Sequence, residues 1–228
     1  MILSAHQPDF FPYMGFFYKI AKSDIFVILH DVKFTNKKNA NMHNYNYIKG
    51  PQGMQKITLP VKYHSGALIK DVLVYHDKKH VRKLLTSIEQ YYGKAPFFET
   101  VYPDILSMFH IDFNLLIDFN VCAIRHFCMK FGIKTRLEWS PGFTSKKNAR
   151  LIDICNHFGA DTYFSGTGAK AYIEPAEFER TGIKLIYSDY SPINYPQRYG
   201  DFIPNLSVLD YVFNMGYELP KGWLSCQK

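Results

Sequence analysis

The residues of this 228-residue chain that could carry chemistry stand where predicted strands end. His6, with Gln7 beside it, follows the apolar run 1–5, and His30-Asp31 follow a second apolar run, 24–29. Ligands of open α/β sheets bind beyond the carboxyl ends of strands. A neutral imidazole there could act as a base, as an acid or as a hydrogen-bond donor that binds phosphate, and a carboxylate could orient it. We therefore predict that His6 and Asp31 are catalytic. The alternatives are that His6 and Gln7 only satisfy loop carbonyl groups and that Asp31 is a turn residue.

A third candidate segment, Ser165-Gly166-Thr167-Gly168, directly follows the predicted strand 161–164. Glycine lets backbone N–H groups turn towards an anion, and hydroxyl groups add donors. We therefore predict that Ser165, Gly166 and Gly168 bind a phosphate of the substrate, although small-residue turns after strands are also common without a ligand. The P-loop, dinucleotide-binding, nucleophile-elbow and HExxH zinc signatures are absent.

Loop residues near the end of the chain are the last candidates. Tyr195 and Gln197 flank a proline, and Asn205 stands at the start of the predicted final helix, 204–215. Dense polar and aromatic loops often carry function, so we predict that all three line a substrate pocket. Asn205 could instead cap the helix.

The pattern of apolar residues predicts the elements that position these sites. The first thirty residues read as strand, helix (13–22) and strand, a βαβ unit that favours a parallel sheet. The remaining predicted elements are a hairpin (44–49 and 55–61), a strand over 69–75, helices over 78–92, 97–109, 114–131, 145–158 and 175–180, and strands over 135–139 and 183–187. We predict an α/β fold with a mostly parallel sheet, a β-hairpin extension and a helical middle section. The chain 1–228 reads as a single domain, with 76–132 as a helical insertion.

Composition limits the partners and the compartment. The net charge is +7, but lysine doublets such as Lys37-Lys38 are scattered, and no basic stripe points to nucleic acid. No apolar run is long enough to span a bilayer, and the start lacks a signal-peptide pattern, so we expect a cytoplasmic protein. The four cysteines, Cys226 among them, read as free thiols, mostly buried. No metal spacing or cofactor motif is present, and homo-oligomerisation is compatible with the sequence.

Several longer sequence blocks resemble one known family. The segment from His6 to Gly15, followed by Lys19-Ile20-Ala21 and Asp24-Ile25-Phe26-Val27, resembles the opening of the WbqC-like family. Other blocks that resemble this family are 31–34, 44–49, 59–61, 159–163, Ser165-Gly166, Tyr172, 195–197, 202–207 and Leu209-Asp210. The resemblance spans nearly the whole chain. It adds Gln7, Asn44, Asn46 and Tyr172 to the predicted substrate-binding residues.

The chain departs from the family pattern in two places. Tyr45 and Tyr47 stand where the family usually has arginines, and His30 stands where it has an acidic residue. A phosphate or carboxylate contact made by those arginines would therefore be lost or moved in this chain.

The resemblance implies a role in the biosynthesis of bacterial O-antigen and other surface polysaccharides. It suggests a sugar nucleotide or a related phosphorylated sugar as the small-molecule substrate, with transfer of an acyl or aminoacyl group to an amino sugar as one fitting reaction. Nucleotidyl transfer is an alternative, because enzymes with an H-x-G-H signature also bind nucleotide after the first strand; Phe16, however, stands in place of the second histidine. A non-catalytic carbohydrate-binding or scaffold protein of the same pathway is the other alternative.

Overall fold

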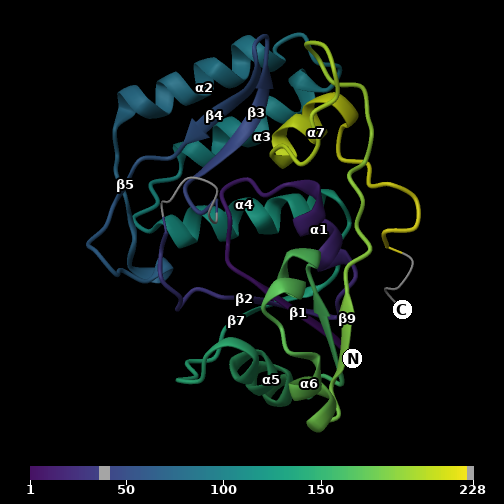
Figure 1. Ribbon diagram of the computed structural model, residues 1–228. Coiled ribbons are helices and arrows are strands. Elements are labelled where there is room, and N and C mark those ends of the chain that lie inside the picture. Colours follow the sequence, from purple (N-terminus) through teal and green to yellow (C-terminus); the bar gives the residue numbers. More distant parts are fainter. Residues whose placement is uncertain (36–41, 225–228) are drawn as a thin grey trace.

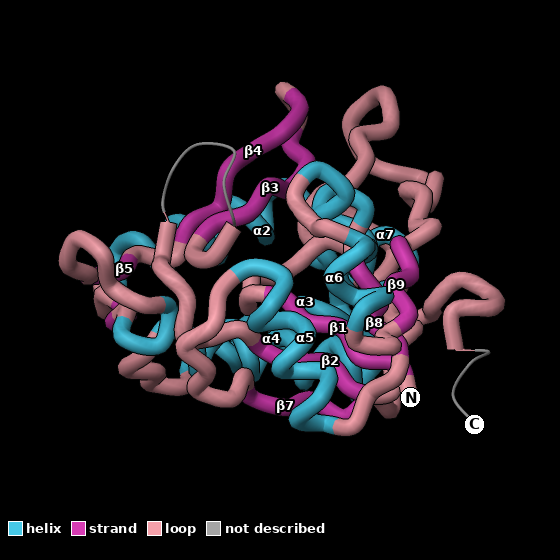
Figure 2. Tube along the Cα trace, turned by 60° about the horizontal axis from the view of Figure 1, so that its bottom comes forward, coloured by secondary structure: helices cyan, strands magenta, loops and turns pink. Residues whose placement is uncertain are grey.

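The structure, a computed structural model, describes residues 1–35 and 42–224 (Figure 1). Its main sheet has five parallel strands. The strands lie in the order β7-β2-β1-β8-β9, side by side in Figure 2. Their bounds are β1 Ile2–His6, β2 Ile25–Ile28, β7 Arg136–Trp139, β8 Thr162–Ser165 and β9 Lys184–Tyr187. The parallel sheet and mixed α/β class predicted from the sequence are confirmed.

Helices cover both faces of this sheet. Helix α1 (Met14–Ala21) and, beyond it, α4 (Leu116–Lys130) lie on one side, whereas α5 (Lys147–Phe158) and α6 (Pro175–Arg180) lie on the other (Figure 1). Successive side chains of a strand point to opposite faces, so Phe26 and Ile28 join the first hydrophobic cluster while Ile25 and Val27 join the second. Strand β2 therefore needs apolar residues at every position.

The helical middle section is also confirmed. It comprises α2 (Lys78–Tyr92), α3 (Phe98–His110) and α4, and the last helix, α7 (Val208–Met215), packs on α3. The Asp77 side chain caps α2 by accepting hydrogen bonds from the backbone N–H groups of Lys79 and His80. The Tyr92 ring stacks on Phe213 with ring centroids 4.8 Å apart. Apolar residues from α2, α3, α4 and α7 belong to the same hydrophobic cluster as α1, so this section is packed continuously onto the sheet.

The β-hairpin extension differs in part from the prediction. Strands β3 (Tyr45–Gly50) and β4 (Gly53–Thr58) form the expected hairpin. The predicted strand 55–61 ends at Thr58, however, and Val61 begins a separate strand, β5 (Val61–Lys62), which pairs with β6 (Leu73–Val74). The predicted strand over 69–75 is wrong: its first half is the 3₁₀-helix η1 (Ile69–Asp71), and only β6 is extended. The reason is the spacing of the buried residues, because Ile69 and Val72 are three apart and both fully buried. A second 3₁₀-helix, η2 (Thr167–Ala171), follows β8.

Three of the four cysteines lie in the described residues. Cys128 and Cys155 are buried, Cys122 is half-buried, and all three are free thiols. Burial raises the pKa of Cys128 and of Cys155 to about 12, so neither is a thiolate at neutral pH. Cys226, and the doublet Lys37-Lys38, lie outside the described residues.

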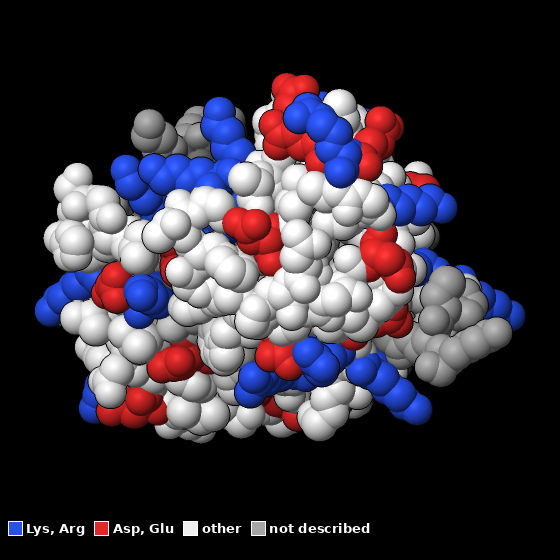
Figure 3. All heavy atoms as spheres, turned by 90° about the horizontal axis from the view of Figure 1, so that it is seen from below, with Lys and Arg blue, Asp and Glu red and all other residues white. Residues whose placement is uncertain are grey.

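The charge of the surface is mixed where α5 and α6 cover the sheet. Viewed from below, acidic and basic side chains alternate around a large uncharged area (Figure 3). In the described part of the chain, no helix has the length and apolarity that crossing a bilayer requires.

Candidate functional site at the carboxyl edge of the sheet

The order of the strands marks one place on the sheet edge. The chain builds outward from β1 through β2 to β7 and then returns to the other side of β1 for β8 and β9. The direction of winding therefore reverses between β1 and β8, and ligands of open α/β sheets bind outside the carboxyl ends at such a point. Ile2 pairs with Thr162 and Leu3 with Tyr163 across these parallel strands, and the two strands end at the same edge of the sheet, β1 at His6 and β8 at Ser165. The fold thus brings two of the predicted segments together.

His6 ends β1 and turns its ring towards α1. Its ring makes an edge contact with the Phe16 ring, with centroids 5.2 Å apart. Its Nδ1 lies 2.8 Å from the backbone oxygen of Gln7. A carbonyl oxygen only accepts, so Nδ1 carries the proton in the neutral ring and Nε2 is left as the acceptor. Burial lowers the pKa of His6, and the carboxylate of Asp9 opposes that shift. The His6 imidazole is therefore neutral at physiological pH.

Asp9 and His43 form the part of the site that the sequence did not reveal. His43 Nδ1 lies 3.4 Å from Asp9 Oδ1, and the His43 side chain is fully buried. Asp9 and His43 both act electrostatically on His6. Asp9 belongs to the opening segment, but nothing in its spacing indicated a partner. His43 lies 34 residues further along the chain, before β3, so only the fold brings the two together.

Buried polar atoms without a hydrogen-bond partner gather around this pair. Eleven such atoms occur among the described residues, and six of them are Gln7 Oε1, Asp9 Oδ1, both ring nitrogens of His43, Asn44 Oδ1 and Asn120 Oδ1. Buried polar groups are usually paired, and each exception calls for an explanation. A bound molecule or ordered water that supplies both donors and acceptors would satisfy this set. The cluster of unpartnered atoms therefore supports a binding site here.

Lys19 brings a buried amine to the same place. It stands on α1, is 7% exposed, and donates from Nζ to the backbone oxygen of Ala5 at 2.8 Å. Burial lowers the pKa of Lys19 to about 7, and its charge also acts on His6. A sequence signal for it existed, because lysine stands among Phe16, Phe17 and Ile20 on an apolar helix.

The loop between β1 and α1 is held in place by distant side chains. Asn46 Nδ2 donates to the carbonyl oxygens of Phe10 (3.1 Å) and Phe11 (2.8 Å), and Ser207 Oγ donates to that of Phe11. Asn120 Nδ2 donates to the carbonyl oxygens of Pro8 (3.0 Å) and His43 (2.7 Å). These contacts fix the position of Asp9. Asn46 is 1% exposed, and its amide is occupied by the loop.

The hairpin residues beside Asn46 are also engaged within the protein. Asn44 Nδ2 donates to the backbone oxygen of Leu59. Tyr45 is buried against Tyr47, and Lys56 Nζ lies 3.8 Å from the centroid of the Tyr45 ring. A cation from β4 therefore lies against the ring of Tyr45.

Asp31 lies at the end of β2, as predicted, but its partner is not His6. Its carboxylate forms an ion pair with the Arg150 guanidinium of α5 and accepts a hydrogen bond from Ser140 Oγ at 2.9 Å. His30 packs its ring against Trp139, with centroids 5.2 Å apart. The structure therefore places Asp31 in a polar cluster at the ends of β2 and β7, whereas Asp9 is the carboxylate beside His6.

The predicted phosphate-binding segment lies beside β1 at the end of β8. Ser165 is buried, Gly166 has the extended backbone angles φ −68° and ψ 152°, and η2 follows. Neither Gly166 nor Gly168 has a positive φ, and a Cβ at either position would meet no other atom within 4 Å. The space beyond both glycines is therefore open. Tyr172, at the end of η2, is 67% exposed.

Tyr195 and Gln197 belong to a buried network around Asp210. The Asp210 carboxylate accepts hydrogen bonds from Tyr92 Oη (2.6 Å), Tyr195 Oη (2.7 Å) and Gln197 Nε2 (2.8 Å). The buried Lys49 ammonium donates to Gln197 Oε1 at 3.1 Å. Burial raises the pKa of Asp210 in spite of these donors.

Asn205 does not cap α7, because Ser207 accepts the hydrogen bond from Leu209 N and is the N-cap. Asn205 has a φ of 58° and borders a cavity of about 10 Å³ with Tyr195. Packing requires glycine at position 15 of α1, because a Cβ there would lie 2.3 Å from the Tyr13 ring and 2.8 Å from the Tyr190 ring.

No group of three or more His, Cys, Asp or Glu side chains in the described ranges 1–35 and 42–224 is arranged to hold a metal ion.

Known proteins resemble this chain along nearly its whole length. Residues 7–221 match the WbqC-like protein family. The chain is also 31% identical over 232 residues to an uncharacterized protein of Mycobacterium tuberculosis, Rv1507c, and the alignment covers 97% of each chain. No solved structure matches.

Proposed function

This chain belongs to the WbqC-like protein family, and we propose that it binds a sugar nucleotide or a related phosphorylated sugar at the carboxyl edge of its sheet. The proposed setting is the biosynthesis of bacterial surface polysaccharide in the cytoplasm. His6, Asp9 and His43 would form the reactive side of the site. Ser165, Gly166 and Gly168 would face the phosphate across the reversal point between β1 and β8.

The observation that carries this proposal is the state of His6. Its ring is neutral because burial lowers its pKa, and its Nδ1 is held by the backbone of Gln7, so that Nε2 can accept a proton. Asp9 is placed to stabilise the imidazolium that would form. A base arranged in this way suits a reaction that removes a proton from a nucleophile at neutral pH.

The reaction that we propose is transfer of an acyl or aminoacyl group from an activated donor, such as a thioester, to the amine of an amino sugar. The amine nitrogen attacks the carbonyl carbon, and a new C–N bond forms. The bond from that carbon to sulfur breaks, and the sulfur leaves with its electron pair. The proton lost by the nitrogen passes to His6 Nε2. Gln7 and Tyr172 would contact the sugar. Asp31 would orient the substrate from the end of the neighbouring strand, β2.

Nucleotidyl transfer is the second candidate, and the strand order favours it. Numbered along the sheet, the parallel strands follow the order 3-2-1-4-5, as in dinucleotide-binding folds, which bind at the corresponding reversal point. This is a likeness of fold, and fold alone does not determine a reaction. Release of pyrophosphate from a nucleoside triphosphate in the presence of Mg²⁺ would identify this activity.

The experiment begins with a thermal-shift screen of nucleotide sugars and nucleotides against the purified chain. A ligand at a hundred times its Kd adds about 2.7 kcal/mol to the free energy of unfolding. Any ligand found is then incubated with acyl and aminoacyl thioesters, and the product is measured by mass spectrometry. His6→Gln should lower turnover by about 10² to 10⁴ while leaving the Kd within a few-fold. The matched control is His64→Gln, because His64 is exposed and its Nδ1 likewise lies near the backbone oxygen of the next residue, Ser65.

Two results would contradict the proposal. If His6→Gln abolished binding and left residual turnover unchanged, His6 would be a binding donor and not the base. If a nucleotide sugar bound but no donor panel gave turnover, the chain would be a non-catalytic carbohydrate-binding or scaffold protein.

A further inference from the structure

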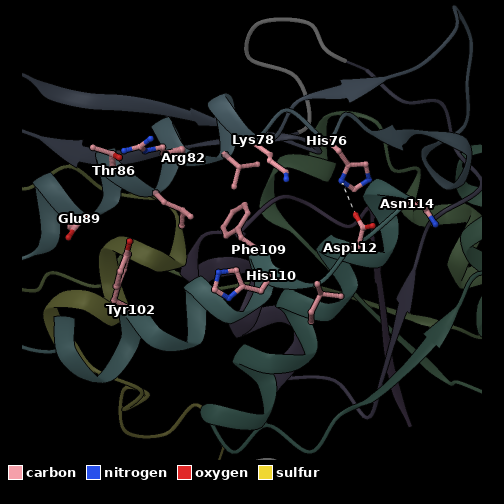
Figure 4. Close-up of a pocket in the computed structure, with 13 residues that line it drawn as sticks. His76, Lys78, Arg82, Thr86, Glu89, Tyr102, Phe109, His110, Asp112 and Asn114 are labelled. Carbon is pink, nitrogen blue, oxygen red and sulfur yellow. Dashed lines mark ion pairs between the residues drawn. The ribbon is translucent and has the colours of Figure 1, made fainter.

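A large cavity lies in the helical middle section, away from the sheet edge. It has a volume of about 930 Å³ and lies between α2 and α3 and the turn that follows α3 (Figure 4). Small-molecule sites usually measure about 300 to 1,000 Å³, so this cleft is large enough for a metabolite-sized ligand. None of the residues proposed for the sheet-edge site lines it.

The cleft combines an apolar floor with a basic wall. Its floor includes Val81 and Leu85 of α2 and Phe109 of α3. Lys78 and Arg82 stand above the floor on α2, and in Figure 4 the Phe109 ring lies below them. Positions four apart on a helix share one face, so the two cations point to the same side.

The charges of this wall are not neutralised by the protein. In the described part of the chain, neither Lys78 nor Arg82 forms an ion pair. The two carboxylates that line the cleft have other neighbours. Asp112 pairs with His76 at 3.1 Å, and the charge of Glu89 acts electrostatically on Tyr102. Figure 4 places Asp112 and Glu89 at opposite ends of the cleft, with Lys78 and Arg82 between them.

We propose that the α2–α3 cleft binds a small amphiphilic anion, with its phosphate or carboxylate group on Lys78 and Arg82 and its apolar body on Val81, Leu85 and Phe109. A guanidinium binds such a group through two parallel hydrogen bonds, and an ammonium adds a point charge. The apolar body gains free energy by covering the floor. His110, which also faces the cleft, adds a further donor on the α3 side.

Three compounds test the two halves of this site on the purified full chain by isothermal titration calorimetry. They are 1-naphthyl phosphate, which has both parts, 1-naphthol, which lacks the anion, and inorganic phosphate, which lacks the body. The expected result is saturable binding of 1-naphthyl phosphate, with a Kd at least ten-fold lower than that of either partial compound. Arg82→Gln and Lys78→Gln should each raise this Kd by about ten-fold.

Matched variants separate this cleft from the rest of the chain. Lys83→Gln removes an exposed lysine of α2 that does not line the cleft. The Kd of this variant for 1-naphthyl phosphate should therefore equal that of the native chain. His6→Gln should also leave the Kd unchanged, because His6 belongs to the other site. The proposal is overturned if Lys83→Gln and Arg82→Gln act alike, if 1-naphthol binds as tightly as its phosphate, or if His6→Gln removes binding. Circular dichroism of each variant shows whether α2 is intact.

Discussion

The side-chain amide of Asn46 holds the carbonyl oxygen of Phe11 at 2.8 Å, and Phe11 has the left-handed φ of 42°. A non-glycine residue in this region is strained and persists only where its surroundings hold it. Asn46→Ala would remove donors from two buried carbonyl groups, those of Phe10 and Phe11. We expect the free energy of unfolding to fall by about 2–4 kcal/mol, measured by urea denaturation.

A second asparagine provides the control for this prediction. Asn156 is exposed on α5, so Asn156→Ala should change the free energy of unfolding by less than about 0.5 kcal/mol. Equal losses for the two variants would show that Asn46 does not hold the loop.

Lys19 should make stability depend on pH in a defined direction. Its pKa is about 7 in the folded protein, against 10.5 for the free side chain. Between these values the unfolded chain binds a proton that the folded chain does not, so stability rises with pH through this window. Below about pH 7 both forms are protonated, and the full cost of burying the charge is present.

Lys19→Met removes this titration, and a comparison of urea unfolding from pH 6 to pH 10 measures it. Above pH 7, the free energy of unfolding of the native chain should rise relative to that of the variant by up to about 1.4 kcal/mol per pH unit. Lys134→Met is the control, because Lys134 is exposed. Parallel curves for the native chain and Lys19→Met would show that Lys19 is not buried as a neutral amine.

The ion pair of Asp31 and Arg150 should contribute to stability. Their side chains are 14% and 13% exposed, so either charge alone would be poorly solvated. Arg150→Met should lower the free energy of unfolding by about 2 kcal/mol, less than the 3–5 kcal/mol of a fully buried pair. Adding Asp31→Asn should restore part of this loss, because no unpaired carboxylate then remains. A double variant less stable than Arg150→Met would contradict the account.

Local patterns predicted most of the fold, because strands and helices here are set by residues close in sequence. Helices α2 and α6 were predicted with the bounds they have, and Gly159 ends α5 in the left-handed conformation typical of that position. The exception, residues 69–75, shows the limit of such patterns, since buried residues three apart in a short segment fit a 3₁₀ turn as well as an irregular strand.

The sequence placed the candidate residues along the chain but did not show which of them meet. His6, Asp31 and Ser165 could be placed at strand ends because parallel strands share one carboxyl edge. Which carboxylate reaches which base depends on strand order and loop path, and neither is encoded locally. Asp31 meets Arg150, 119 residues away, instead of His6.

Gly166 offers the sharpest test of the proposed phosphate site. Its φ of −68° suits alanine, and a Cβ there would meet no protein atom within 4 Å. Gly166→Ala should therefore leave the free energy of unfolding unchanged or raise it by less than about 1 kcal/mol. If a phosphate lies against this backbone, as we propose, the added methyl group should raise the Kd of a nucleotide sugar found in the screen by at least ten-fold. Gly142→Ala is the control, because that glycine is equally unobstructed but follows β7. An unchanged Kd for Gly166→Ala would place the phosphate elsewhere on the sheet edge.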